Sequence, residues 1–272
     1  MTRPLVMGVV NVTPNSFSDG GRFLDHGAAL SHARALIAEG ADILEIGGES
    51  TRPGAEPVAE AEEIARVSPL IEAVRAESDI LMSVDTMKPA VARAAMAAGA
   101  DIWNDVTALR WSPDSLEAAA DLGCEVVLMH MLGEPRTMQD DPRYEDVVAE
   151  VVAFLEDRAR VAIRAGVPRE KIWLDPGIGF GKTVDHNLAL LANLDRLVAL
   201  GFPVLLGASR KRFLAALDPT AKAASDRLGG SIAAALTGAA AGIAAVRVHD
   251  VAQTRQALVV QAAISQKRGG ST

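Results

Sequence analysis

Short apolar runs alternate with longer amphipathic stretches along the whole chain. The runs stay apolar at consecutive positions, which is typical of parallel strands covered by helices on both faces. The runs that predict strands are 5–12, 42–47, 80–85, 101–106, 125–130, 172–176, 203–209 and 243–249. Stretches with helical period lie between them and include 27–39, 59–77, 88–98, 144–165, 187–200 and 228–241. The chain is therefore predicted to be a βα repeat of about eight units.

Such a repeat in one chain predicts an α/β fold with a single domain, the (β/α)₈ or TIM barrel, rather than an open sheet. We expect the domain to cover residues 1–264 and residues 265–272 to form a flexible tail. Two polar segments, 7–21 and 47–57, end the first and second predicted strands and are rich in turn-forming residues. They predict long mobile loops over the mouth of the barrel, and the arginine of the second could clamp an anion.

Composition narrows the class of protein. The chain has 272 residues, a net charge of -8 and only 4% aromatic residues, which argues against a nucleic-acid-binding surface. We find no signal-peptide pattern and no apolar run approaching about 18 residues, so we expect a cytoplasmic protein with no membrane partner. Cys124 is the only cysteine, which excludes an intrachain disulfide and predicts a buried, inert thiol.

A polar side chain stands at the carboxyl end of nearly every predicted strand. These residues are Asn11, Glu49 with Thr51 and Arg52, Asp85, Asn104 with Asp105, His130, Asp175, Ser209 with Lys211, and Arg247 with His249. In a barrel these positions meet at one mouth, where enzymes with this fold hold their active sites. Helix capping could account for Asp, Asn and Ser at such positions. It does not account for the arginines, the lysine or the histidines, so the pattern predicts an active site.

The segment LDPGIGFGK, residues 174–182, is not a nucleotide-binding loop. A phosphate-binding P-loop needs four residues between its first glycine and the Gly-Lys pair, whereas three separate Gly177 from Gly181. The segment also fails the dinucleotide fingerprint, because its third glycine falls one residue early. Both nucleotide interpretations are rejected.

Eight segments in order resemble the dihydropteroate synthase family. They are MGVVNVTPNSFSDGG (7–21), GGESTRPGAEP (47–57), SVDT (83–86), WNDV (103–106), LMHM (128–131), LDPGIGFGK (174–182), GASRK (207–211) and VRVHDV (246–251). The resemblance covers nearly the whole chain. Asn15 departs from the family, which more often has aspartate after the NVTP tetrapeptide.

The resemblance implies a pterin-binding barrel with three neighbouring subsites. A dihydropterin presents an amine and ring N–H donors beside a carbonyl, which suit carboxylate, asparagine and lysine partners. The implied pterin residues are Asp85, Asn104, Asp175 and Lys211, with His130 and Met131 along the pocket wall; for His130 a purely structural role is an equal alternative. Arg247 and His249 are implied to hold the diphosphate, with Asn11 helping to position Mg²⁺. Thr51, Arg52, Pro53, Phe180 and Ser209 are implied to form the para-aminobenzoate pocket.

The implied reaction joins 6-hydroxymethyl-7,8-dihydropterin diphosphate to para-aminobenzoate, giving 7,8-dihydropteroate and diphosphate in folate biosynthesis. Our hypothesis is dissociative substitution, with Lys211, Arg247, His249 and Asp85 as the catalytic set. Family membership also implies a homodimer, through helices late in the chain, and competition by sulfonamides. Two alternatives stay open. One is a methyltetrahydrofolate:corrinoid methyltransferase, which needs no diphosphate-binding residues, and the other is a catalytically silent pterin-binding protein.

Overall fold

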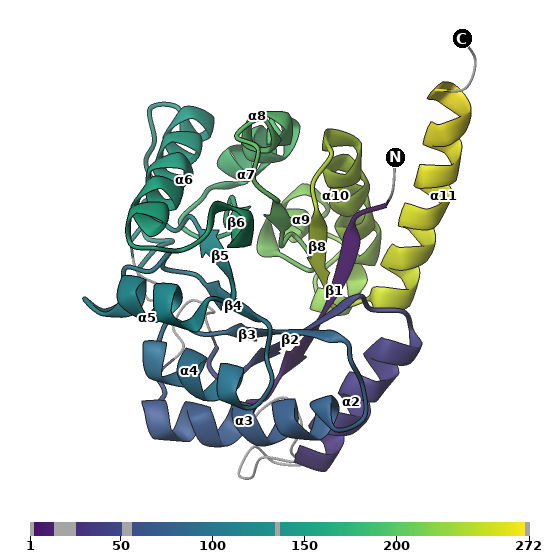
Figure 1. Cartoon of the computed structure of the whole chain (residues 1–272). Helices are drawn as coiled ribbons and strands as arrows, with labels where there is room; N and C mark the ends of the chain where they lie inside the picture. The colour runs from purple at the N-terminus through teal and green to yellow at the C-terminus, as the bar shows by residue number, and fades with distance from the viewer. Residues whose placement is uncertain (1–2, 14–25, 51–55, 134–136, 270–272) are drawn as a thin grey trace.

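The computed structural model describes residues 3–13, 26–50, 56–133 and 137–269, and it shows a barrel of parallel strands surrounded by helices (Figure 1). The strands are β1 Leu5–Asn11, β2 Ile43–Gly47, β3 Leu81–Asp85, β4 Ile102–Asp105, β5 Glu125–Met129, β6 Ile172–Asp175, β7 Leu205–Leu206 and β8 Ala245–Val248. The predicted (β/α)₈ barrel is confirmed. Residues 14–25 and 51–55, which include about half of the two predicted mobile loops, lie outside the described residues, and residues 7–11 of the first predicted loop belong to strand β1.

The strands follow the order β6-β5-β4-β3-β2-β1-β8-β7, and every pairing is parallel. The ring is completed between β6 and β7 by the isolated bridge Leu174↔Val204. Here the Leu174 N–H donates to the Pro203 carbonyl over 2.9 Å. This join, which we call the seam, is narrower than the run 203–209 suggested, because only Leu205–Leu206 is a regular strand.

The helices fall between the strands as the pattern predicted. They are α2 His26–Ala38, α3 Glu60–Arg75, α4 Pro89–Ala97, α5 Ser115–Leu122, α6 Val147–Arg164, α7 Val184–Ala192, α8 Leu194–Val198, α9 Arg212–Leu217, α10 Leu228–Ala241 and α11 Val251–Gly269, with 3₁₀ turns at Arg169–Lys171 and Ala224–Arg227. The single helix expected over 187–200 is two helices. Asn193 separates them with a non-helical backbone and bonds the Ala189 carbonyl through Nδ2 at 2.8 Å.

The expected flexible tail differs from the structure over most of its length. Helix α11 continues through Gly269, so residues 265–269 are helical, and residues 270–272 lie outside the described residues. The polar composition that suggested fraying is also compatible with a solvated helix, and α11 packs against α10 and β1 through buried Val251 and Leu258.

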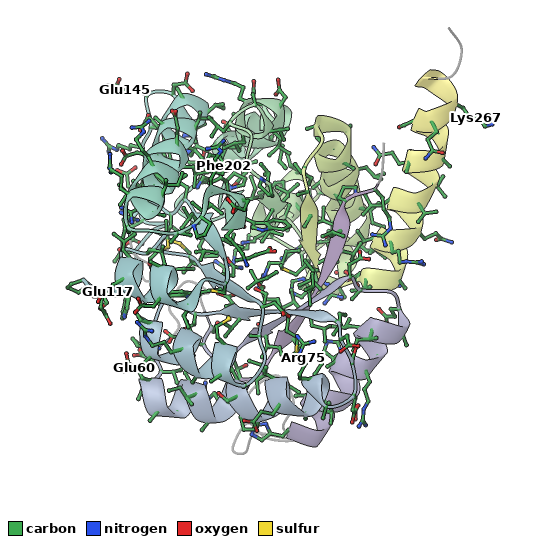
Figure 2. All side chains as sticks on the ribbon, in the orientation of Figure 1. Glu60, Arg75, Glu117, Glu145, Phe202 and Lys267 are labelled. Carbon is green, nitrogen blue, oxygen red and sulfur yellow. The ribbon has the colours of Figure 1, made fainter. Side chains whose placement is uncertain are left out.

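Side chains fill the space between the strands and the surrounding helices (Figure 2). A second, smaller apolar cluster lies inside the barrel, with one side chain from each of six strands. Its buried members are Met7, Ile43, Ile102, Val127, Leu205 and Ala245. This cluster closes the barrel interior below the carboxyl ends of the strands, so the barrel is a packed core and not a pore.

Candidate active site

A cavity lies at the carboxyl ends of the strands. It is lined by Asp85, Asn104, Val106, Met129, Asp175, Gly177, Ile178, Phe180, Gly207, Lys211 and Arg247. Six of these residues, Asp85, Asn104, Asp175, Phe180, Lys211 and Arg247, were predicted from the sequence as site residues. The structure therefore brings together side chains that lie up to 162 positions apart in the chain.

The two-residue period of a strand explains why these residues lie in one layer at the bottom of the cavity, which we call the floor. Successive inward positions on a strand are two residues apart. Four members of the interior cluster are followed, two residues later in the chain, by a residue that lines the cavity. The pairs are Ile102 and Asn104, Val127 and Met129, Leu205 and Gly207, and Ala245 and Arg247. Two residues beyond Ile43 stands Glu45, which is fully buried. The apolar layer thus supports a polar layer that carries the chemistry.

Arg247 lies among carboxylates on this floor. Its Nε donates to Glu45 and its Nη2 donates to Asp85 Oδ2 over 3.1 Å. Glu45 accepts a second hydrogen bond from Asn104 Nδ2 at 2.5 Å. Although burial opposes it, the Glu45 and Asp85 carboxylates raise the pKa of Arg247, which keeps the guanidinium charged. Asp85 Oδ1 and Asn104 Oδ1 are buried and have no hydrogen-bond partner within the described part of the chain.

Asp175 and Lys211 face the cavity from the two sides of the seam. Asp175 Oδ1 accepts from the Gly177 N–H over 2.7 Å. The Lys211 ammonium lies 4.1 Å from the centre of the Phe180 ring, a cation–π contact. Burial raises the pKa of Asp175 to about 6 and lowers that of Lys211 to about 8. Burial, with the nearby Glu45 charge, raises the pKa of Asp85 to about 7. These shifted values mark a functional site.

We expect the affinity for a pterin that lacks phosphate to be highest between about pH 7 and 8. Below that range Asp85 and then Asp175 take up protons, which turns one acceptor oxygen of each into a donor, and above it Lys211 loses its charge. For each of these groups, a pH one unit beyond its pKa lowers the affinity roughly tenfold. Calorimetric titrations from pH 5 to 9.5 measure the profile, and Lys211→Gln should lack the alkaline limb. A flat profile in the unchanged protein would contradict the expectation.

Gly177 shapes the turn that follows β6. Its φ is +66°, and a Cβ placed there would lie 1.9 Å from the backbone oxygen of His130. Gly123 has a similar φ of +58° but no atom within 4 Å of such a Cβ. We expect Gly123→Ala to cost about 1 kcal/mol of unfolding free energy from backbone strain alone, and Gly177→Ala at least about 3 kcal/mol. Urea unfolding of the two variants measures the difference; equal losses would show that the clash with His130 is relieved.

Ser209 and His249, which follow β7 and β8, contact each other and are not among the residues that line the cavity. Ser209 Oγ lies 3.1 Å from His249 Nδ1, and the His249 N–H donates to Ser209 Oγ at 3.3 Å. Between Ser209 and Lys211, Arg210 has a φ of +59° and forms a two-bond ion pair with Asp250, at 3.0 and 2.6 Å. This ion pair stabilises the backbone between two predicted site residues.

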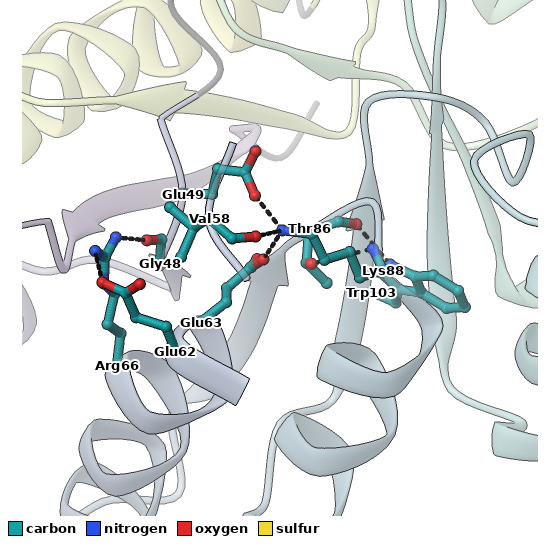
Figure 3. A network of polar contacts seen from close by, with 9 residues as sticks. All are labelled: Gly48, Glu49, Val58, Glu62, Glu63, Arg66, Thr86, Lys88 and Trp103. Atoms are coloured by element: carbon teal, nitrogen blue, oxygen red, sulfur yellow. Dashed lines mark hydrogen bonds and ion pairs between the residues drawn. The ribbon is translucent and has the colours of Figure 1, made fainter. Parts of the chain in front are cut away.

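A buried network lies next to the site, at the ends of β2 and β3 (Figure 3). The Lys88 ammonium donates to Glu49, to Glu63 at 2.5 Å and to the Val58 carbonyl at 2.7 Å. Glu49 and Val58 flank residues 51–55, so one cation fixes both described ends of this segment. Thr51, Arg52 and Pro53 lie outside the described residues, as does Asn15.

Other predicted residues have more ordinary surroundings. His130 bonds the buried Lys182 ammonium, with 2.9 Å between Nδ1 and Nζ, and burial lowers its pKa to about 3. Its side chain packs edge-on against Phe154 with 4.9 Å between ring centres, and His130 is not among the residues that line the cavity. Met131 is likewise not among the residues that line the cavity, and it packs in an apolar cluster with Met129 and Phe180, which do line it. The structural alternative for His130 is therefore the one that the geometry favours.

Two other strand-end residues are also accounted for. Asp105 accepts from the N–H groups of Thr107 and Leu109, both at 2.7 Å, so it holds a turn rather than facing the cavity. Cys124 is free and buried, and burial raises the pKa of its thiol to about 11, which fits the predicted inert thiol.

The sequence pattern did not single out Glu45, Lys182, Val106, Met129 or Ile178. Among the described residues, no group of three or more His, Cys, Asp and Glu side chains could hold a metal ion by itself. No helix within the described ranges is long and apolar enough to cross a membrane.

Comparisons with known proteins agree on one family. The sequence model of the family described as "Pterin binding enzyme" matches residues 7–249. The dihydropteroate synthase of Escherichia coli (strain K12) is 46% identical over 268 residues, 98% of this chain and 94% of that protein. Two solved structures of Xanthomonas albilineans dihydropteroate synthase are also similar. The one with 4-aminobenzoic acid has a TM-score of 0.91 at 52% identity, covering 97% of this chain and 93% of that one. The one with 7,8-dihydropteroate has a TM-score of 0.88 at 48% identity, covering 97% and 95%.

Proposed function

The chain belongs to the pterin-binding enzyme family, and from this premise we propose that the cavity is the active site of a dihydropteroate synthase. The enzyme is a transferase of folate biosynthesis. It transfers the pterinylmethyl group of 6-hydroxymethyl-7,8-dihydropterin diphosphate to the amine of para-aminobenzoate and releases diphosphate.

The observation that carries this proposal is the set of acceptors on the cavity floor. Asp85 Oδ1 and Asn104 Oδ1 are buried and have no hydrogen-bond partner among the described residues, and Asp175 faces the same space from β6. Unpaired buried acceptors cost free energy, so they indicate a ligand that brings N–H donors. The 2-amino-4-oxopyrimidine edge of a dihydropterin is such a ligand, and its carbonyl suits the Lys211 ammonium. A Cβ on Gly207 would lie 3.7 Å from Arg247 and 3.8 Å from Asp175, so a glycine here keeps the space between these two residues free of a side chain.

The reaction then proceeds by dissociative substitution at the exocyclic carbon. The carbon–oxygen bond breaks, its electron pair leaves with the diphosphate, and the electron-rich dihydropterin stabilises the remaining cation. Arg247 and His249 stabilise the charge that develops on the leaving group. The amine lone pair of para-aminobenzoate forms the new carbon–nitrogen bond, and the amine proton passes to solvent. No protein nucleophile takes part. Phe180 and Ser209, with Thr51, Arg52 and Pro53, would hold the aryl ring and its carboxylate.

The residues fit Mg²⁺ bound mainly through substrate. Asn11 Oδ1 and Asp85 Oδ2 lie 3.7 and 4.0 Å from the position of a Cβ on Gly47, so two oxygens of the chain lie near Gly47 at the end of β2. Mg²⁺ prefers oxygen ligands and keeps waters and substrate phosphates, so a dedicated cluster of acidic residues is not needed. When bound, Mg²⁺ would neutralise diphosphate charge, while Asn11 would help to hold it.

A homodimer and a cytoplasmic location belong to the same proposal. Helix α11 exposes Val259, Val260 and Ile264, which is compatible with an interface late in the chain. Helix α10 buries Ser231, Ala234, Ala235 and Gly238, so this face of the helix packs within one chain. Light scattering of the purified protein measures its mass in solution, and we expect the mass of a dimer.

The test is release of diphosphate from dihydropterin diphosphate and Mg²⁺, with and without para-aminobenzoate. We expect dihydropteroate to form in step with diphosphate, and a sulfonamide to compete with para-aminobenzoate. Tight pterin binding without product would instead indicate the silent binding protein. Methyl transfer from methyltetrahydrofolate would indicate the corrinoid methyltransferase. A trapped covalent pterin–enzyme adduct would contradict the dissociative step.

A further inference from the structure

Glu45 lies beneath the cavity and contacts both halves of its floor. It is fully buried on β2, and each of its carboxylate oxygens has a different partner. Oε1 accepts from Asn104 Nδ2 at 2.5 Å, and Oε2 accepts from Arg247 Nε. Asn104 belongs to the proposed pterin subsite and Arg247 to the proposed diphosphate subsite. One carboxylate therefore joins the two subsites without lining the cavity itself.

The contact with Glu45 determines how the Asn104 amide is turned. An amide can present either an oxygen acceptor or an NH₂ donor, and its neighbours decide which. A carboxylate only accepts, so Asn104 must direct Nδ2 toward Glu45. Its Oδ1 is then the atom left for a ligand, in agreement with its lack of a partner among the described residues.

We propose that Glu45 is a positioning residue that fixes Asn104 as an acceptor toward the pterin and Arg247 as a donor toward the diphosphate. The inference rests on the proposed function and goes beyond it, because Glu45 contacts neither substrate. Arg247 points with one nitrogen to Glu45 and with another to Asp85, which defines the plane of its guanidinium. Glu45 thereby determines which groups on the cavity floor donate hydrogen bonds to a ligand and which accept them.

The substitution Glu45→Gln makes this proposal testable. A glutamine offers one acceptor and one donor in place of two acceptors. If its oxygen stays with Arg247, its NH₂ faces Asn104, whose amide must turn and present donors to the pterin donors. If its oxygen stays with Asn104, its NH₂ opposes the Arg247 Nε–H. We expect the first arrangement, because the bond to the guanidinium is charge-assisted. The dissociation constant of a pterin without phosphate should rise about 10-fold to 100-fold.

A second substitution separates this role from a general need for a buried charge. Asn104→Asp in the otherwise unchanged protein places a carboxylate against Glu45, and we expect it to weaken pterin binding at least as much. In the Glu45→Gln background the same Asn104→Asp change gives the glutamine NH₂ an acceptor and restores an acceptor toward the pterin. The double variant should recover at least about tenfold of the lost affinity, since the hydrogen-bond polarity is restored.

The experiment measures pterin affinity by calorimetry and thermal unfolding for the unchanged protein, both single variants, the double variant and Glu63→Gln. Glu63 is the control for loss of a buried carboxylate: it is 1% exposed, and its hydrogen bond goes to Lys88 rather than to the Asn104 amide or Arg247. We expect weak binding in both single variants, recovery in the double variant and near-normal affinity in the control. Additive losses in the double variant, or unchanged affinity in Glu45→Gln, would overturn the inference. Absence of pterin binding by the unchanged protein would overturn the proposed function, and the inference with it.

Discussion

Replacing Arg247 by alanine is expected to lower kcat/KM for dihydropterin diphosphate by roughly 10²-fold to 10³-fold, the usual cost of losing one preorganised partner of a developing anion. The change removes the Arg247 cation from the proposed diphosphate subsite. It also leaves Glu45 and Asp85 without their shared partner on the floor of the cavity. Most of the loss should appear in kcat, because the charge on the leaving group develops during the reaction.

Arg247→Lys is the matched control for charge. Lysine keeps the positive charge but cannot donate in one plane to Glu45 and Asp85 together. We expect it to recover only part of the activity. Steady-state kinetics of diphosphate release, with thermal unfolding of each variant, measures both effects. Full activity in Arg247→Ala would exclude this residue from the diphosphate subsite.

Asp175→Asn is expected to raise the dissociation constant of the pterin by about 10²-fold. The carboxylate has two acceptor oxygens, whereas the asparagine amide has one acceptor oxygen and one NH₂ donor. One oxygen of Asp175 holds the Gly177 N–H, so the asparagine must keep its carbonyl there and turn its NH₂ toward the pterin donors. The loss should appear with the diphosphate substrate and with a pterin that lacks phosphate, unlike the loss in Arg247→Ala.

Asp105→Asn controls for the loss of a buried strand-end carboxylate. Asp105 is equally buried but holds the backbone of Thr107 and Leu109. We expect Asp105→Asn to lower the unfolding free energy and to change pterin affinity little. If both aspartate variants weaken pterin binding equally, Asp175 has no special place in the subsite.

The fold was predictable from the sequence because its signals are local. Consecutive apolar runs, helical periods between them and polar strand ends specify a parallel barrel and its mouth. Boundaries were less predictable where one side chain decides them, as Asn193 does by ending α7. The polar composition of 265–269 could not reveal that α11 continues to Gly269, since a solvated helix and a frayed tail have similar composition.

The site was predictable residue by residue where a motif or a strand end marks it, as with Asp175 and Lys211. Glu45 carried a weaker signal: it is the one charged residue within strand β2, Ile43–Gly47, and a buried strand tolerates such a charge only with a partner. Its partner Arg247 lies 202 positions away, and only the register of the barrel brings the two together. Lys182 likewise needed the structure, because its contact with His130 crosses from one strand end to the next.

The seam between β6 and β7 gives the substrate a second effect on the protein. Asp175 ends β6 on one side of the seam, and Lys211 follows β7 on the other. A pterin ring bound by both residues links the two edges of the barrel where they are joined most weakly. At a ligand concentration 100 times its dissociation constant, such binding adds about 2.7 kcal/mol to the stability of the folded state. Because proteases attack opened chains, bound dihydropterin is expected to slow proteolysis of the protein as well as to serve as its substrate.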